Sequence, residues 1–313
     1  MKTDKLLALL VASAIAGGTA QGDISLSDNF SVRGFLDTRY SNDDQGGGTE
    51  IEELNVETFD IDFLFDTEKV DAEVHVNAMD ANGHSLEIEQ AFFSYELGNG
   101  FDITAGRYYT LLGFERDETN MIYQPSYAYT FGGSNKNPYG VYHNGVRANY
   151  GSDTFSASIS LVDGVRVADE DAEDLGFEAQ VKFTGIEGLT LAIGTAQDDQ
   201  NALAGIDKYW NFFVQYDGIE KLVLAAEVNR YEMAEEDADS WMLMGNYAAT
   251  DKFGVTLRYS EANEDFGSYE ADKFTVSPSY SITDNLMGRL EYSFGEENMV
   301  DVDYFGVQAV WTF

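Results

Sequence analysis

From Asn29 to the C-terminus, apolar residues recur at every second position, and this two-residue period limits the chain to β-strands with two unlike faces. In the last segment, Phe305, Val307, Ala309 and Trp311 alternate with neighbours such as Gln308 and Thr312. A water-soluble β-sandwich also alternates in this way. Two further features, the lengths of the connections and the placement of the aromatic residues, favour a membrane barrel over a sandwich.

The connections between the alternating segments are short and long in turn. Seven tight turns are expected near residues 67–69, 98–100, 151–153, 185–188, 217–220, 250–252 and 283–285. Eight longer polar stretches lie near residues 42–53, 80–85, 111–137, 166–174, 198–207, 232–239, 262–270 and 295–301. Together they join sixteen strands, with short turns at one end and long loops at the other, as in outer-membrane barrels. We therefore predict an all-β, 16-stranded antiparallel transmembrane β-barrel with short periplasmic turns and long extracellular loops, closed by pairing of residues 29–41 with 301–313.

Aromatic residues of the apolar face collect near the short turns and the C-terminus. They are Phe65, Phe101, Tyr150, Phe155, Phe183, Tyr216, Tyr247, Phe253, Tyr280 and Trp311. A ring of this kind is typical of a membrane interface girdle. The chain ends on Phe313, with Trp311 on the same face, and this ending resembles the terminal strand by which bacterial outer-membrane proteins are recognised for insertion. We therefore expect Trp311 and Phe313 to serve the girdle and the contact with the barrel assembly machinery.

The N-terminus predicts the compartment. Lys2 and Lys5 precede residues 6–16, which are apolar apart from Ser13, and small residues follow up to Ala20. This is the pattern of a secretory signal, and the run is shorter than the ~20 residues of a membrane-spanning helix. We expect residues 1–20 to be a signal peptide, with cleavage after Ala16 as an alternative, and residues 21–313 to form a single barrel domain in the bacterial outer membrane.

Composition excludes several classes of protein. The 18 basic and 56 acidic side chains give a net charge of −38, which repels phosphate backbones and excludes nucleic acid as a partner. The absence of cysteine excludes a disulfide scaffold and a thiolate metal site. An aromatic content of 14% is too high for a disordered acidic chain, so the chain folds.

Residues 105–115, with the sequence AGRYYTLLGFE, carry a resemblance to a known family. The segment resembles the Gly-Lys-x-x-x-Pro-x-Gly-x-Glu run of the OmpL-like β-barrel porin family, with Arg107 in place of the lysine and leucine in place of the proline. Asn120, Ser126 and the segments 142–150 and 161–164 continue the pattern, with Asp163 where the family has Asn. The resemblance implies a bacterial outer-membrane porin that passes small hydrophilic solutes and contacts outer-membrane lipid and lipopolysaccharide. The shared length and strand count of general trimeric porins leave a homotrimer open.

The longest connection, residues 111–137, is the candidate constriction loop. A barrel of 16 strands is too wide for side chains to fill, and in porins the corresponding loop folds into the lumen and narrows it. We expect the acidic residues Glu115, Asp117 and Glu118 to face basic residues of the barrel wall and to make the channel prefer cations. The basic set is Arg33, Arg39, Arg147, Arg258 and Arg289. The alternative is a plain extracellular loop with solvated charges.

Two other functions were weighed against a channel. Acidic runs at residues 169–174 and 235–239 have enough carboxylates to bind Ca²⁺ or Mg²⁺ loosely, which leaves open an acidic surface barrel that acts in adhesion or in binding divalent ions or lipopolysaccharide. An outer-membrane hydrolase needs a positioned histidine, but His75, His84 and His143 lie in no hydrolase motif. We therefore expect no enzyme activity, no catalytic residue and no resident metal or cofactor.

Overall fold

The computed structural model describes residues 22–79, 85–115, 118–132, 134–138, 142–165, 175–198, 206–233, 236–265 and 268–313. The predicted signal peptide, residues 1–20, lies outside the described residues and stays a prediction. No helix among the described residues is long and apolar enough to cross a membrane.

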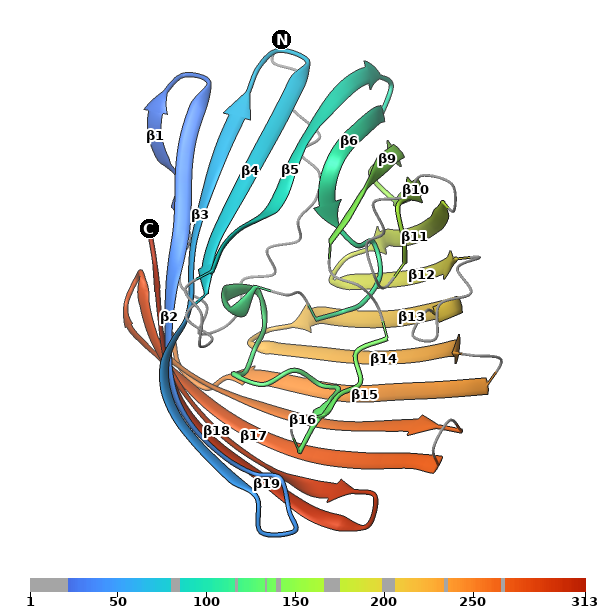
Figure 1. Cartoon of the computed structure of the whole chain (residues 1–313). Helices are drawn as coiled ribbons and strands as arrows, with labels where there is room; N and C mark the ends of the chain where they lie inside the picture. Colours follow the sequence, from blue (N-terminus) through green and yellow to red (C-terminus); the bar gives the residue numbers. More distant parts are fainter. Residues whose placement is uncertain are drawn as a thin grey trace.

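Sixteen antiparallel strands form one closed barrel, as predicted (Figure 1). They are β2 (Phe30–Asp44), β3 (Glu50–Asp66), β4 (Val70–Met79), β5 (Ser85–Gly98), β6 (Phe101–Tyr109), β9 (Tyr142–Gly151), β10 (Phe155–Val162), β11 (Gly176–Ile186), β12 (Leu189–Gln197), β13 (Ile206–Ile219), β14 (Leu222–Met233), β15 (Glu236–Ala248), β16 (Phe253–Glu264), β17 (Tyr269–Thr283), β18 (Leu286–Glu297) and β19 (Val300–Thr312). Each strand pairs with the next along the chain. A short strand, β1 (Ile24–Ser27), adds to β2, and the hairpin β7 (Thr130–Phe131) and β8 (Ser134–Asn135) lies in the segment between β6 and β9.

The first and last barrel strands close the sheet. β19 pairs with β2 in a continuous register that runs from Asp303 opposite Asp44 to Thr312 opposite Phe35. The predicted pairing of the two chain ends is therefore confirmed. Closure satisfies the backbone groups of both edge strands, which an apolar membrane could not do.

The expected short turns all join consecutive strands at one end of the barrel. The turn between β5 and β6 places Asn99 and Gly100 at φ 56° and 83°, the left-handed conformation that a two-residue hairpin turn requires. Some connections at the other end are shorter than expected. The stretch predicted at residues 295–301 is mostly strand, and only Asn298 and Met299 separate β18 from β19. Polar residues there continue the sheet because paired strands remain stable beyond the membrane, where water solvates both faces.

The two faces of the strands have the expected chemistry. On β19, the side chains of Phe305, Val307 and Trp311 are 40–42% exposed on the outer face, whereas Gln308 and Thr312 are buried on the inner face. Trp311 and Phe313 lie on the outer face with their ring centroids 4.9 Å apart. The apolar residues therefore face outward and the polar residues inward, which is the reverse of a water-soluble barrel.

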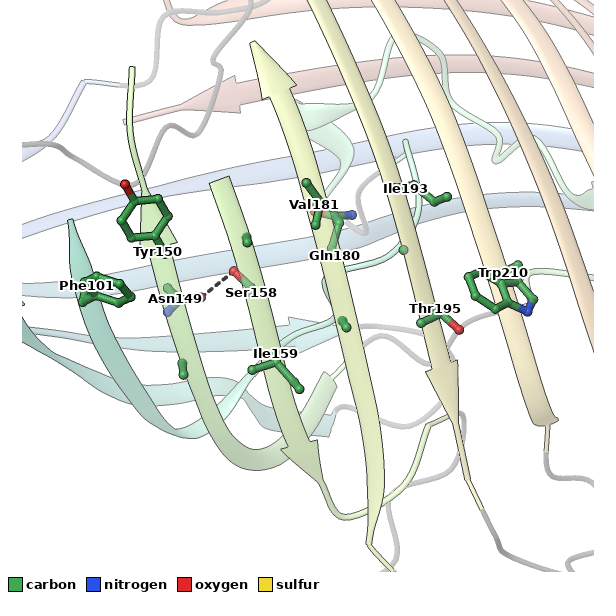
Figure 2. Close-up of a pocket in the computed structure, with 14 residues that line it drawn as sticks. Phe101, Asn149, Tyr150, Ser158, Ile159, Gln180, Val181, Ile193, Thr195 and Trp210 are labelled. Atoms are coloured by element: carbon green, nitrogen blue, oxygen red, sulfur yellow. Dashed lines mark hydrogen bonds between the residues drawn. The ribbon is translucent and has the colours of Figure 1, made fainter. Parts of the chain in front are cut away.

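A shallow depression interrupts the outer face across β9 to β12. It forms where the small side chains Ala148, Ala157 and Ala179 lie on adjacent strands, between larger side chains such as Tyr150 and Trp210 (Figure 2). Its exposed lining is almost entirely apolar. Because it opens on the membrane-facing surface, it is not part of a path for hydrophilic solutes.

Candidate functional site

The segment that connects β6 to β9, called here the inner loop (residues 110–138), lies inside the barrel. Figure 1 shows it in green, crossing the interior between the walls. Its described parts are residues 110–115, 118–132 and 134–138, and they include the 3-10 helix η1 (Thr119–Met121). Ile122 and Phe131 are fully buried although they belong to a connection between strands. The inner loop therefore occupies the lumen.

Apolar contacts hold one side of the inner loop against the wall. Tyr129 and Phe131 belong to a buried cluster with Met242, Met244 and Ala262, which point inward from β15 and β16. Burying an aromatic side chain of this size contributes about 1.5–3 kcal/mol. Small residues such as Ala225 of β14 and Ala271 of β17 complete this cluster, and they leave room for the rings of the inner loop.

Buried carboxylates fix the first part of the inner loop. The Thr110 hydroxyl donates a hydrogen bond of 2.6 Å to Glu178 on β11. The backbone N–H of Phe114 donates to Glu227 on β14 at 2.7 Å, and the Tyr129 hydroxyl donates to the same carboxylate at 3.0 Å. These acceptors satisfy loop donors that the lumen wall would otherwise leave unpaired.

Glu115 forms a buried ion pair with Arg258 of β16. The Arg258 Nη1 to Glu115 Oε1 distance is 2.6 Å, and the Arg258 side chain is 0% exposed. Glu115 also accepts hydrogen bonds from the Gln124 amide at 2.6 Å and the Ala128 backbone N–H at 2.7 Å. Arg258 donates in addition to the carbonyl of Ser126 at 2.9 Å. This pair connects the two arms of the inner loop to each other and to the wall.

Three further basic side chains of the wall donate to backbone carbonyls of the inner loop. They are Arg39 to Pro125 at 2.9 Å, Arg289 to Thr119 at 2.9 Å, and Lys273 to Tyr127 at 2.8 Å and Thr130 at 2.6 Å. Lys273 is not among the site residues predicted from the sequence, although its inward register position marks it as part of the wall. Basic wall residues thus bind the loop backbone as well as its carboxylates.

The other predicted site residues differ in what they contact. Glu115 faces Arg258, a member of the predicted basic set, and Arg258 neutralises its charge. Arg33 pairs with Asp62 at 2.7 Å and also interacts electrostatically with Glu118, and Arg147 stacks on the Tyr108 ring with the guanidinium carbon 4.0 Å from the ring centre. Asp117 lies outside the described residues.

Glu118 is the loop carboxylate that reaches the opposite wall. Its Oε1 lies 3.8 Å from Nδ1 of His75 on β4, and the side chain is 11% exposed. His75 also lies 2.9 Å from Asp62 Oδ1 and 2.8 Å from Glu73 Oε2. The inner loop therefore spans the lumen from the basic wall at β16 to a mainly acidic wall at β3 and β4.

Carboxylates predominate among the buried charges. Of the described charged residues that are more than nine-tenths buried, eleven are acidic and three are basic, histidines apart. The basic ones are Arg258, Lys273 and Arg289, and the acidic ones are Asp37, Asp60, Asp62, Glu89, Glu115, Asp163, Glu178, Asp198, Glu227, Glu264 and Glu291. The interior of the barrel is acidic as a whole.

The described histidines have carboxylate rather than hydroxyl neighbours. His143 Nε2 lies 3.0 Å from Glu178, and neither His143 nor His75 is hydrogen bonded to a serine or threonine hydroxyl in the described part of the chain. Within the same residues, no three carboxylate or imidazole groups are arranged to hold a metal ion. His84 lies outside the described residues.

A family model described as "Putative beta-barrel porin-2, OmpL-like" matches residues 56–308. The match covers nearly all barrel strands and the inner loop. No curated protein matches the chain at a significant level.

Solved outer-membrane proteins share the fold at low sequence identity. An OmpF of Salmonella typhi in complex with daunomycin is 14% identical, with a TM-score of 0.70 over 93% of this chain and 100% of that chain. An anion-selective porin from Comamonas acidovorans is 14% identical, with a TM-score of 0.65 over 91% and 99% of the two chains. A trimer form of in-vitro folded OmpT of Vibrio cholerae is 15% identical, with a TM-score of 0.65 over 91% and 100%.

Proposed function

The chain belongs to the OmpL-like β-barrel porin family, an outer-membrane family, and from this we propose that it forms a water-filled diffusion channel for small hydrophilic solutes with a preference for cations. The observation that carries the proposal is the inner loop, which the wall holds across the lumen of a closed 16-stranded barrel through Arg39, Arg258, Lys273 and Arg289. A segment fixed in this way narrows a channel, whereas an adhesive loop would project outward.

The cation preference rests on the charges of the interior. Buried carboxylates outnumber buried basic side chains among the described residues, and the basic ones bind the inner loop. The fold itself does not fix the sign of selectivity, because the porin from Comamonas acidovorans with the same fold is anion-selective. An excess of carboxylates concentrates cations in a narrow, low-dielectric passage.

A hydrolase is disfavoured by the placement of the histidines. Both described histidines lie on barrel strands and face carboxylates, and a nucleophile needs a base within hydrogen-bond reach of its hydroxyl. The nearest arrangement to a triad, His143 with Glu178 and Thr110, orders the groups wrongly, because the Thr110 hydroxyl donates to the carboxylate rather than to the histidine.

The remaining partners follow from the surface. The exposed apolar belt suits acyl chains of outer-membrane lipid and lipopolysaccharide, and the trimer form of OmpT makes a homotrimer a natural assembly to test. Loose binding of Ca²⁺ or Mg²⁺ at the acidic loops stays a prediction. Residues 169–174 and 234–235 lie outside the described residues, and Asp237 is engaged by Arg230 at 2.7 Å.

The test is the conductance of purified protein in a planar bilayer with a KCl gradient. We expect stable current steps and a reversal potential of the sign for cation preference, which weakens at high salt because ions screen the lumen charges. A protein that inserts without current steps would refute the channel. Current steps with an anion-selective reversal potential would refute the cation preference and leave the channel intact.

A further inference from the structure

Asp60 and Asn77 lie side by side on the inner face of β3 and β4. They are direct partners in the antiparallel register, which places their side chains next to each other on the same face of the sheet. On the other side of Asn77, its amide nitrogen donates to Glu89 Oε1 of β5 at 2.5 Å. The amide oxygen of Asn77 is therefore turned away from Glu89.

Both side chains have an oxygen without a donor. Asp60 is 1% exposed and Asn77 is 5% exposed, and Asp60 Oδ1 and Asn77 Oδ1 have no hydrogen-bond partner. A buried acceptor without a donor costs about 1–3 kcal/mol. Asp60 also lies within hydrogen-bond distance of the Asp62 carboxyl group. Neither oxygen accepts from an N–H or hydroxyl donor, so these neighbouring acceptors favour a group that brings positive charge between them.

The inner loop brings another carboxylate near this pair. Glu118 lies close enough to Asp60 for their like charges to repel, as do Asp62 and Glu89. Glu118 Oε2 is also buried without a hydrogen-bond partner, while its Oε1 faces His75 at 3.8 Å.

The nearby basic groups are occupied elsewhere. Arg33 donates its Nε to Asp62 at 2.7 Å, and the His75 ring lies between Asp62 and Glu73 at 2.9 and 2.8 Å. They neutralise Asp62 and Glu73 and also act on Glu118, but neither forms an ion pair with Asp60 among the described residues.

We propose that Asp60, Asn77 and Glu118 form a weak transit site for hard cations, in which K⁺ or Na⁺ exchanges part of its water shell for these oxygens at the point where the inner loop meets the acidic wall. Oxygen donors of carboxylates and amides are the ligands that such cations prefer. Ions bind the site only in transit, and it is not a metal centre, since no three carboxylate or imidazole groups of the described residues are arranged to hold a metal ion. The proposal rests on the channel function and names the groups that give it its cation preference.

The experiment compares Asp60→Asn and Asn77→Leu with the control Asp102→Asn. Asp102 lies on β6, accepts a hydrogen bond from Asn149 at 2.6 Å, and loses the same charge when replaced. For each protein we measure the K⁺ to Cl⁻ permeability ratio from the reversal potential, and the Ca²⁺ concentration that half-blocks the K⁺ current. Heat-dependent gel mobility and circular dichroism verify that each variant has folded.

We expect Asp60→Asn to raise the half-blocking Ca²⁺ concentration about thirtyfold, since two unit charges about 4 Å apart interact by about 1 kcal/mol even in bulk water and the double charge of Ca²⁺ doubles that energy. Asn77→Leu keeps the net charge of the protein. A rise in the half-blocking Ca²⁺ concentration of this variant therefore reports the loss of an oxygen ligand rather than the loss of a negative charge. Asp102→Asn should leave the half-block nearly unchanged.

The outcomes separate this site from the channel function. If Asp60→Asn and Asn77→Leu conduct and retain the wild-type half-block and permeability ratio, the site is wrong while the channel stands; this result is expected if Asp60 shares a proton with Asp62 instead of binding a cation. If all three variants change equally, the general field of the lumen acts and not this site. If the wild-type protein passes no current, the channel proposal fails first.

Discussion

Phe313 closes the barrel on Gly34. The backbone N–H of Phe313 donates to the Gly34 carbonyl at 3.0 Å, and the Gly34 N–H donates back to Phe313 at 2.9 Å. The Phe313 ring lies over Gly34 so closely that a Cβ added there would stand 2.6 Å from the ring Cζ and 2.3 Å from the Asp60 carbonyl oxygen. The terminal aromatic residue thus needs a glycine on the first barrel strand.

Replacing Gly34 by alanine should impair assembly. The added methyl group cannot be accommodated without moving Phe313 or the backbone of β3, so we expect a lower yield of heat-resistant barrel in the outer membrane. Gly288→Ala on β18 is the matched control, because the nearest atoms to a Cβ there are 3.9 Å away. Equal yields of the two variants would contradict a role for the close contact.

Deleting Phe313 should reduce insertion more than replacing Thr312 by valine. Phe313 lies on the outer face with Trp311, whereas Thr312 is buried on the inner face, away from any surface that a factor outside the barrel could read. The measurement is the amount of each protein in the outer-membrane fraction. Similar amounts for both variants would remove the case for a terminal insertion signal.

Breaking the Glu115–Arg258 pair should release the inner loop. Removing one partner of a buried ion pair costs about 3–5 kcal/mol, because the other charge remains buried without compensation. We expect Glu115→Gln and Arg258→Met each to lower the denaturation midpoint and to enlarge the single-channel current. In the double variant the loss of stability should be smaller than the sum of the two single losses, and strict additivity would show that the pair does not act as a unit.

Phe131→Ala should make the current unsteady. Phe131 is fully buried in the cluster that fixes the inner loop to β15 and β16, and truncation of a buried phenylalanine costs about 3–5 kcal/mol. We expect brief fluctuations of the single-channel current as the inner loop leaves the wall, and recordings in planar bilayers measure them. Phe131→Leu keeps most of the side-chain volume, so its current should be as steady as that of the wild type. Equal current fluctuations in both variants would show that they do not arise from the loss of this packing.

Neutralising Glu115, Asp117 and Glu118 together should shift the reversal potential toward anions. The shift should be larger at low salt than at high salt, because the screening length shortens from about 30 Å at 0.01 M to about 3 Å at 1 M. An unchanged reversal potential at low salt would mean that these carboxylates do not act on permeating ions.

The sequence by itself determined the barrel. Few alternatives are left by the two-residue period, the short turns at one end and the aromatic residues near those turns. Lipid on one side of each strand and water on the other impose this pattern on every strand independently. The pairing of residues 29–41 with 301–313 follows from the same rules, because an open barrel would leave unpaired edges in lipid. Even Trp311 and Phe313 could be placed on the outer face from their positions alone.

Only the tertiary structure decided the partners inside the lumen. Glu115 and Arg258 are 143 positions apart in sequence, and their 2.6 Å contact depends on the course of the inner loop across the barrel. Periodicity marks both residues as polar but does not say which basic residue meets which carboxylate. For the same reason the sequence grouped Glu115 with a set of five basic wall residues, and only the structure pairs it with Arg258. Only the structure, too, shows that Asp60, Asn77 and Glu118 are among the residues with a buried oxygen that lacks a donor. Strand patterns are set by local solvent exposure, but ion pairs across a lumen are set by the closed geometry of the whole barrel.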